Sequence, residues 1–284
     1  MKKIDWTNFL NSLRHIKWVS FNAVTRTIEL CWRDRIRIGI GAKKDEVIAI
    51  IEQLRPIKLE KGLIRIGGPR DGGYLMPDDL QGVVACISPG VSDEVSFDVE
   101  MANRGMKVIL ADASVEGPPI ENGSFEFHKK FLGPKSNQMF IRLDDLVNDF
   151  APAGDLLLQM DIEGAEYSVL LDCSEETLAR FRIIVLEIHD LGAMFGKFGA
   201  GVVATLVEKL NRSHLVVHNH ANNCCGSETR FGIEVPRVME LTFYRRDRLG
   251  ASDTSYATLP HPLDADNVPA RPPLQLAKVW SGAE

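Results

Sequence analysis

Three carboxylates that follow one short apolar run are the residues best suited to chemistry. The run 156–158 leads into Gln159-Met160-Asp161-Ile162-Glu163-Gly164-Ala165-Glu166, which places three acids within six positions. Open α/β sheets bind their ligands at the carboxyl ends of the strands. We therefore predict that Asp161, which ends the strand, faces a ligand cleft. Glu166 has a simpler explanation, because an acid in the first turn of a helix complements the helix dipole.

Two further apolar runs end in titratable residues. Glu187 and His189 end one of them, and His218 and His220 end the other. Both ends are expected at the same edge of the sheet as Asp161, so His189 and His220 are candidate general bases that the sequence does not rank. A divalent cation such as Mg²⁺, bound by Asp161, Glu187 and a neighbouring side chain, is the alternative way to activate a hydroxyl group. The other histidines are interpreted as structural: His15, His128, His214 and His261.

A cofactor loop is predicted at the end of an earlier strand, residues 83–87. Gly90 in this loop would let the backbone approach a ligand closely. Asp112 ends the next strand, roughly 20 residues later, where an acid can accept hydrogen bonds from a ribose diol. A dinucleotide fingerprint has three glycines and this loop has one, so a ligand without phosphates fits better. The expected cofactor contacts are Ser88, Pro89, Gly90, Val91, Asp112, Ala113, Ser114 and Asp161.

Alternating apolar runs and amphipathic segments must position these residues. This alternation predicts a mostly parallel sheet with helices on both faces. No helical period separates the last two strands, so we expect them to be antiparallel. The expected strands are 63–66, 74–76, 83–87, 108–111, 125–131, 140–143, 156–160, 183–188, 215–218 and 238–244, and the expected helices lie around 47–54 and 95–101 and at 144–149, 166–171 and 202–210.

Three parts of the chain differ in character. Residues 1–60 read as a helical extension, 61–250 as the α/β domain, and 251–284 as a proline-rich tail packed on that domain. The extension begins with an apolar helical face that would pack on the protein's own core, on a second subunit in a homodimer, or on a membrane surface. That face consists of Trp6, Phe9, Leu10, Leu13 and Ile16.

The overall composition indicates a globular protein. The chain has 284 residues, of which 45% are apolar and 25% charged, and its formal charge of −6 argues against a general nucleic-acid binder. Five cysteines show neither a disulfide framework nor zinc-ligand spacing, so reduced thiols in a cytoplasmic protein are expected. The apolar residues near the N-terminus are too interrupted for a signal peptide or a membrane span.

The segment Asp161–Glu166 matches the D-[IV]-E-G-x-E signature of the FkbM-type methyltransferases, which the chain resembles over roughly residues 62–245. Arg65, the loop 88–93 and the segment 143–146 extend the resemblance. The cofactor loop departs from it, because Ser88-Pro89-Gly90-Val91-Ser92 stands where many members have D-x-G-A-N-x-G. The resemblance implies a class I fold and S-adenosylmethionine as methyl donor. It also implies that the turn residues Asp71, Gly72 and Tyr74 lie over the cofactor pocket.

The resemblance implies methyl transfer to a hydroxyl group of a saccharide or related metabolite, so the expected partner is a small-molecule or glycan acceptor. Asp112 would hold the ribose, Asp161 would lie between donor and acceptor, and His189, His220 or a metal would activate the acceptor. Three alternatives remain open at this point. They are a nicotinamide-dependent oxidoreductase, a binding protein that keeps the fold without catalysis, and an N-methyltransferase.

Overall fold

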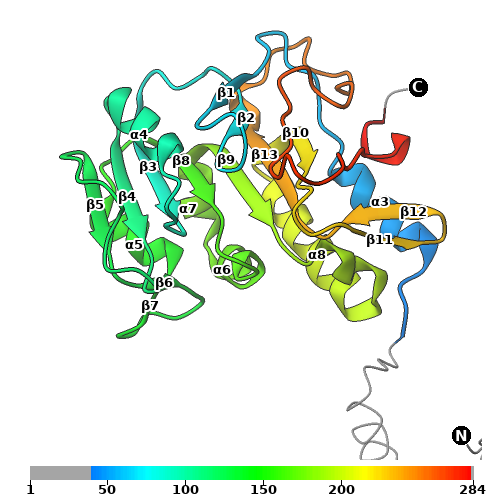
Figure 1. The fold of residues 1–284 in the computed structure, drawn as a ribbon, viewed down its shortest axis with the longest axis horizontal. Helices are drawn as coiled ribbons and strands as arrows, with labels where there is room; N and C mark the ends of the chain where they lie inside the picture. Colours follow the sequence, from blue (N-terminus) through cyan, green and yellow to red (C-terminus); the bar gives the residue numbers. More distant parts are fainter. Residues whose placement is uncertain (1–39, 283–284) are drawn as a thin grey trace, which may run out of the picture. The chain divides into compact units, whose positions relative to one another are not determined.

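A seven-stranded sheet in the order β10-β13-β9-β8-β3-β4-β5 forms the centre of the protein (Figure 1). The structure, a computed structural model, describes residues 40–282. The predicted N-terminal apolar face lies outside these residues. The strands of the sheet are β3 (Val83–Pro89), β4 (Lys107–Ala111), β5 (Phe125–His128), β8 (Asp155–Met160), β9 (Phe181–Ile188), β10 (His214–Ala221) and β13 (Met239–Arg245).

The strand order creates a switch point between β3 and β8. The chain runs outward from β3 through β4 to β5 and then returns to the other side of β3 to form β8 and β9. Loops leaving β3 and β8 therefore diverge, which opens a crevice at the carboxyl ends of these two strands. β13 is antiparallel to both β9 and β10, and this confirms the predicted reversed strand in a mostly parallel sheet.

Both faces of the sheet are covered, which explains why its strands read as continuous apolar runs. In β8, Leu156 and Leu158 point into one core and Leu157 into the other. The second core is supplied by α4 and by the hairpin of β1 (Ile64–Ile66) and β2 (Tyr74–Met76), and the first by the other five helices, α3, α5, α6, α7 and α8. The helices are α3 (Lys44–Gln53), α4 (Ser96–Asn103), α5 (Leu143–Phe150), α6 (Glu166–Asp172), α7 (Glu175–Arg180) and α8 (Lys197–Asn211), with short 3₁₀ turns η2 (Leu191–Phe195), η3 (Arg246–Arg248) and η4 (Lys278–Trp280).

Small two-stranded sheets surround the main one. The predicted hairpin is confirmed as β1 (Ile64–Ile66) and β2 (Tyr74–Met76). The single strand predicted over 125–131 is wrong, because the Lys130 amide donates to the His128 carbonyl in a tight turn that separates β5 from β6 (Phe131–Leu132). β6 pairs with β7 (Phe140–Ile141), which is shorter than predicted because Leu143 already begins α5. A hairpin of β11 (Ser227–Arg230) and β12 (Ile233–Pro236) fills the connection before β13.

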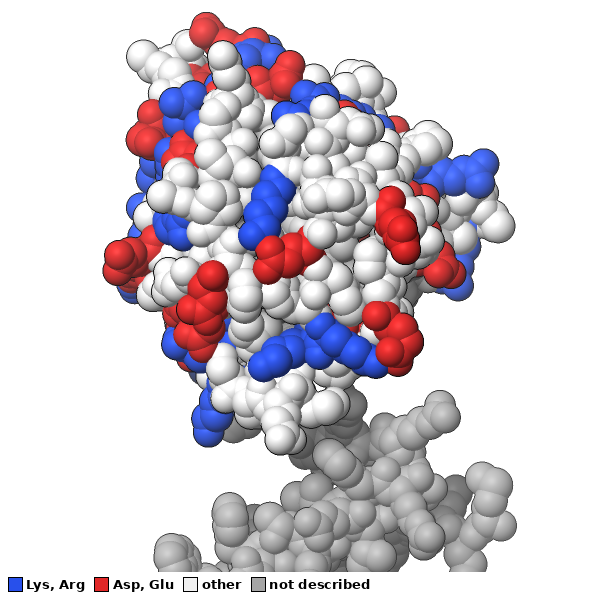
Figure 2. Space-filling model, turned by 90° about the vertical axis from the view of Figure 1, so that its left-hand side faces the viewer, with Lys and Arg blue, Asp and Glu red and all other residues white. Residues whose placement is uncertain are grey.

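The segment that follows β13 runs back past the ends of β10 and β13 (Figure 1, orange to red). The Asp264 carboxylate lies 2.8 Å from His218 Nε2, and the fully buried Trp280 donates its indole N–H to the Glu234 carbonyl at 3.0 Å. Through these contacts the tail packs against the α/β domain. The predicted domain boundaries after residues 60 and 250 stay a prediction. On the face shown in Figure 2, acidic and basic side chains are interspersed. Within residues 40–282, no helix has the length and hydropathy needed to cross a membrane.

Asp79 ties the segment after β2 to the last strand. Its carboxylate accepts hydrogen bonds from the Tyr244 hydroxyl at 2.6 Å and from Arg248 at 2.8 and 2.9 Å. Burial raises the pKa of Asp79, but these hydrogen bonds outweigh it and lower the pKa to about 2. The folded state therefore binds this proton less readily than the unfolded state, in which the pKa is about 3.9.

We expect stability to fall as the pH drops from about 4 to about 2, because Asp79 must then be protonated. The Asp79→Asn variant should lose on the order of 1 kcal/mol at pH 7 and show a flatter acid dependence in this window. Denaturant titrations at several pH values measure both effects. Asp78→Asn, at an exposed neighbouring carboxylate, is the matched control. Parallel pH profiles for wild type and Asp79→Asn would contradict the assignment.

Candidate active site

Gly90 brings the loop after β3 against the loop after β8. Its φ angle is +90°, and a Cβ atom built there would lie 1.7 Å from the Asp161 carbonyl oxygen. The Gly90 amide donates to the Ala111 carbonyl at 3.1 Å. Gly90 therefore lies directly against the backbone of Asp161, where a side chain would not fit. Gly90 also lines the cavity described below, so its close approach to a ligand stays a prediction.

Both carboxylate oxygens of Asp112 accept hydrogen bonds from neighbouring residues. Oδ2 accepts from the Val91 amide at 2.9 Å, and Oδ1 accepts from the amide and hydroxyl of Ser114 at 2.7 and 2.6 Å. A carboxylate offers about four lone-pair sites, so three of them are taken and Oδ2 keeps one. Asp112 thus holds the loop after β3 in place and retains one acceptor position for a ligand.

A cavity of about 440 Å³ occupies the crevice at the switch point. This volume falls within the roughly 300–1,000 Å³ that is typical of small-ligand sites. Of the predicted cofactor contacts, Ser88, Pro89 and Ala113 do not line the cavity; Ser88 is buried and donates its hydroxyl to Gln159 at 2.8 Å. The predicted residues that do line it are Asp71, Gly72, Tyr74, Gly90, Val91, Asp112, Ser114 and Asp161.

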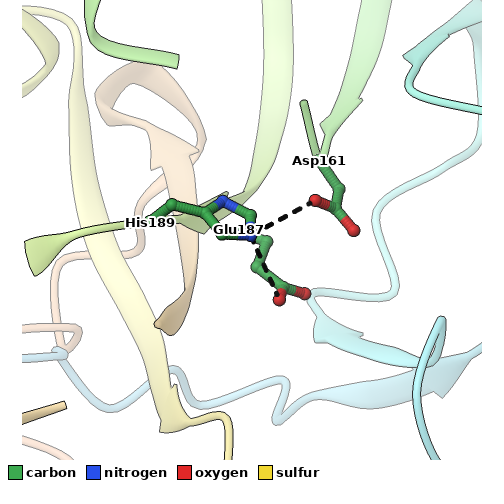
Figure 3. Close-up of side chains that lie close together, drawn as sticks. All are labelled: Asp161, Glu187 and His189. Carbon is green, nitrogen blue, oxygen red and sulfur yellow. Dashed lines mark ion pairs between the residues drawn. The ribbon is translucent and has the colours of Figure 1, made fainter. Parts of the chain in front are cut away.

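Asp161, Glu187 and His189 meet beside this cavity. Figure 3 shows Asp161 reaching toward the other two from the end of β8, while Glu187 and His189 come from the end of β9. His189 Nε2 lies 3.8 Å from Asp161 Oδ1 and 4.0 Å from Glu187 Oε1. One ligand atom from each of the three residues lies within 4.8 Å of the others, so His189 is the neighbouring side chain that the sequence left unspecified.

Glu166 orients His189. His189 Nδ1 lies 3.1 Å from Glu166 Oε1, and the same oxygen accepts from the amides of Ile162 and Gly164 at 3.0 and 3.2 Å. With Nδ1–H donated to this fixed carboxylate, Nε2 faces Asp161 and Glu187 and also lies 3.4 Å from Oε2 of the exposed Glu163. Glu166 is fully buried, so its interpretation as a helix-dipole residue was incomplete. A carboxylate that orients an imidazole in this way is typical of histidine ligands in metal sites.

Burial and the crowding of acidic side chains shift the pKa values of all three residues in the cluster. Burial, followed by repulsion from Asp161 and Glu240, raises the pKa of Glu187. Burial also raises the pKa of Asp161. Desolvation opposes protonation of His189, yet its hydrogen bond to Glu166 and the surrounding carboxylates raise its pKa overall. Asp161 Oδ1 and Glu187 Oε2 are buried without any hydrogen-bond partner, so the cluster presents unused acceptors.

His220 lies at a different place. It lines a second cavity of about 200 Å³ between the end of β10 and the tail, together with His261 and Asp264. His220 Nδ1 is 3.6 Å from Asp264 Oδ2, and the ring of His220 stacks 6.5 Å from that of His218. The structure therefore does not bring His220 into the Asp161 cluster. His261, interpreted as structural, belongs to this second group.

Several polar residues of the site were not singled out from the sequence. Glu240 pairs directly with Glu187 across β13 and β9, and Asn267 of the tail donates to Glu240 at 2.7 Å and to Asp71 at 3.0 Å. Asn222 donates to Glu187 Oε1 at 2.9 Å. Glu240 could have been placed at the site from the sequence, because the start of an antiparallel strand lies at the same edge of the sheet as the ends of its parallel neighbours. Nothing local in the sequence placed Asn267.

Residues 88–214 match the family model described as Methyltransferase FkbM domain. The match includes the loop after β3, Asp112, and the whole Asp161–Glu187–His189 cluster. It leaves out the β1–β2 hairpin, β13 and the tail. Among curated proteins, no match to the chain is found.

Proposed function

We propose that this protein methylates a hydroxyl group of a saccharide or related metabolite. Residues 88–214 match the FkbM methyltransferase domain, which implies S-adenosylmethionine-dependent methyl transfer. This match favours a methyltransferase over the nicotinamide-dependent oxidoreductase that the sequence left open. The observation that carries the proposal is the Asp161–Glu187–His189 cluster at the edge of the cavity. An alcohol is a poor nucleophile until its proton is removed, and this cluster supplies groups that assist that removal.

The cavity suits the donor. S-adenosylmethionine would supply the methyl group: the acceptor oxygen would form a bond to the methyl carbon as its bond to sulfur breaks, S-adenosylhomocysteine would leave, and the hydroxyl proton would pass to a nearby base. The remaining acceptor position on Asp112 fits a ribose hydroxyl, and Phe131 and Phe140 offer an apolar lining near the same end. Asp161 lines the cavity and also belongs to the cluster, so it lies where donor and acceptor would meet. The residues thus position the two reactants and exclude water, which lowers the barrier without covalent catalysis.

A divalent cation held by Asp161, Glu187 and His189 is the part of the proposal that the unpartnered oxygens support. Two carboxylates and one imidazole form a donor set that suits Mg²⁺ or Mn²⁺. Such a cation would lower the pKa of an acceptor hydroxyl. Glu166 fixes His189, and Asn222 fixes Glu187, so the chain holds both groups in place.

Calorimetric titration with S-adenosylhomocysteine tests the donor site first. We expect saturable binding by the wild type and a loss of at least about 100-fold for Asp112→Ala, because that variant loses a ligand contact and releases the loop at Val91. Glu121→Gln removes one exposed carboxylate and should bind as the wild type does. Equal affinity of wild type and Asp112→Ala would contradict the role of Asp112.

The acceptor is tested with methyl-labelled S-adenosylmethionine and a panel of neutral saccharides, polyols and amines, with and without Mg²⁺ or Mn²⁺. We expect label in methyl ether linkages and a rate that chelation abolishes. Label found only on nitrogen would overturn O-methylation. A rate that is unchanged by chelation would overturn the cation and leave His189 as the base.

A further inference from the structure

Asp98 carries a buried carboxyl group that nothing so far explains. It lies in the first turn of α4, is 7% exposed, and lines the donor cavity. Its Oδ1 is buried with no hydrogen-bond partner. Burial raises the pKa of Asp98 to about 6. A buried acceptor without a hydrogen-bond partner destabilises the folded state, so the fold alone gives no reason to keep it.

Capping of α4 does not account for this carboxyl group. The free amide of Ser96 at the start of the helix already donates to Glu94 Oε1 at 2.8 Å. Hydrogen bonding to Ser88 and to the Asp98 backbone amide moderates the pKa rise that burial causes, although the Ser88 hydroxyl donates to Gln159 Oε1 at 2.8 Å. The buried Oδ1 of Asp98 is still left without a hydrogen-bond partner.

In the donor orientation proposed above, with the ribose at Asp112 and the sulfonium beside Asp161, the methionine part would lie along a wall made by Tyr74, Asp98 and Gln159. All three residues line the cavity, and Gln159 Nε2 lies 3.4 Å from the Tyr74 hydroxyl oxygen. None of the described residues that line the cavity is Lys, Arg or His. The wall is therefore suited to the positive end of a zwitterion.

We propose that Asp98 binds the α-ammonium group of the methionine part of S-adenosylmethionine. The ammonium group supplies the hydrogen-bond donor that the buried oxygen lacks, and a charge-assisted bond of this kind is among the stronger ones in proteins. Asp98 thereby distinguishes donors that carry the amino-acid end from adenosine compounds that do not. This inference rests on the donor and not on the proposed hydroxyl acceptor.

Two probes separate this role from a structural one. S-adenosylhomocysteine carries the ammonium group, whereas 5′-methylthioadenosine keeps the adenine, ribose and sulfur but lacks the amino-acid end. Calorimetry on the full chain should show that Asp98→Asn binds S-adenosylhomocysteine about 10- to 100-fold more weakly than the wild type. Binding of 5′-methylthioadenosine should change less than about twofold, and Glu121→Gln should leave both affinities unchanged.

Equal losses for both probes would assign Asp98 to the architecture of the cavity and overturn the inference. Unchanged S-adenosylhomocysteine affinity in Asp98→Asn would overturn it as well. Failure of the wild type to bind either probe would remove the donor site and the inference together. Failure of the acceptor panel would leave the inference standing, because neither probe requires an acceptor.

Discussion

Replacing His189 by alanine should lower kcat for methyl transfer by about 100- to 10,000-fold, the range expected when an acid–base group or a metal ligand is lost. Donor binding should stay within a few-fold of wild type, because His189 does not line the cavity. Its Nε2 lies 3.8 Å from Asp161 Oδ1 and 4.0 Å from Glu187 Oε1, the two carboxylates with which it forms the cluster. Initial rates with the acceptor found in the panel, together with S-adenosylhomocysteine titrations, separate these two effects.

The metal dependence of the variant then identifies the role of the imidazole. If His189 is a ligand, the variant should need a higher Mn²⁺ concentration for half-maximal activity and regain rate as the metal is raised. If it is a base, added metal should have no effect. His128→Gln is the matched control, because His128 pairs with Glu126 at 3.0 Å and stacks on Phe150 away from the cluster. A wild-type rate for His189→Ala would exclude both roles.

A methyl group at Gly90 should be far more damaging than its size suggests. In Gly90→Ala, the new Cβ would stand 1.7 Å from the Asp161 carbonyl oxygen, which forces the loops after β3 and β8 apart. We expect a loss of roughly 3–5 kcal/mol in unfolding free energy, or a folded protein that no longer binds S-adenosylhomocysteine. Denaturant unfolding followed by calorimetry distinguishes the two results.

Gly105→Ala isolates the backbone strain from the steric overlap. Gly105 has nearly the same φ angle, +85°, but beyond its two chain neighbours no residue has an atom within 4 Å of a Cβ built there. This variant should lose only about 1–2 kcal/mol and should bind the donor normally. Similar losses for the two variants would show that the approach to Asp161 is not what requires glycine at position 90.

The sequence was sufficient to predict the sheet and the residues at the ends of its strands. Asp161, Glu187 and His189 could be foreseen together because parallel strands bring their carboxyl ends to one edge, whatever the details of packing. His220 satisfied the same rule and still lies apart. β13 separates β10 from β9, and Asp264 of the tail accompanies His220 in the second cavity.

Contacts between distant segments could not be predicted in this way. The role of Glu166 depends on how the loop 162–165 folds back, and the signature motif alone does not distinguish this from a helix-dipole acid. Asp98 lies in an amphipathic helix where polar residues normally face solvent, so only the packing of α4 reveals its burial. Asn267 belongs to a segment without periodicity, and its contacts with Asp71 and Glu240 depend on the path of the tail.

The position of β13 also determines when the strands of the main sheet can pair during translation. Of the seven strands of the main sheet, the last to be translated is an interior one, because β13 lies between β9 and β10. β10 therefore has no partner in the main sheet until residues 239–245 have been translated, and cleavage before residue 239 removes the strand that pairs with both β9 and β10. Glu240 is part of β13 and Asn267 follows it, so the surroundings of Glu187 are complete only after residue 267 has been translated.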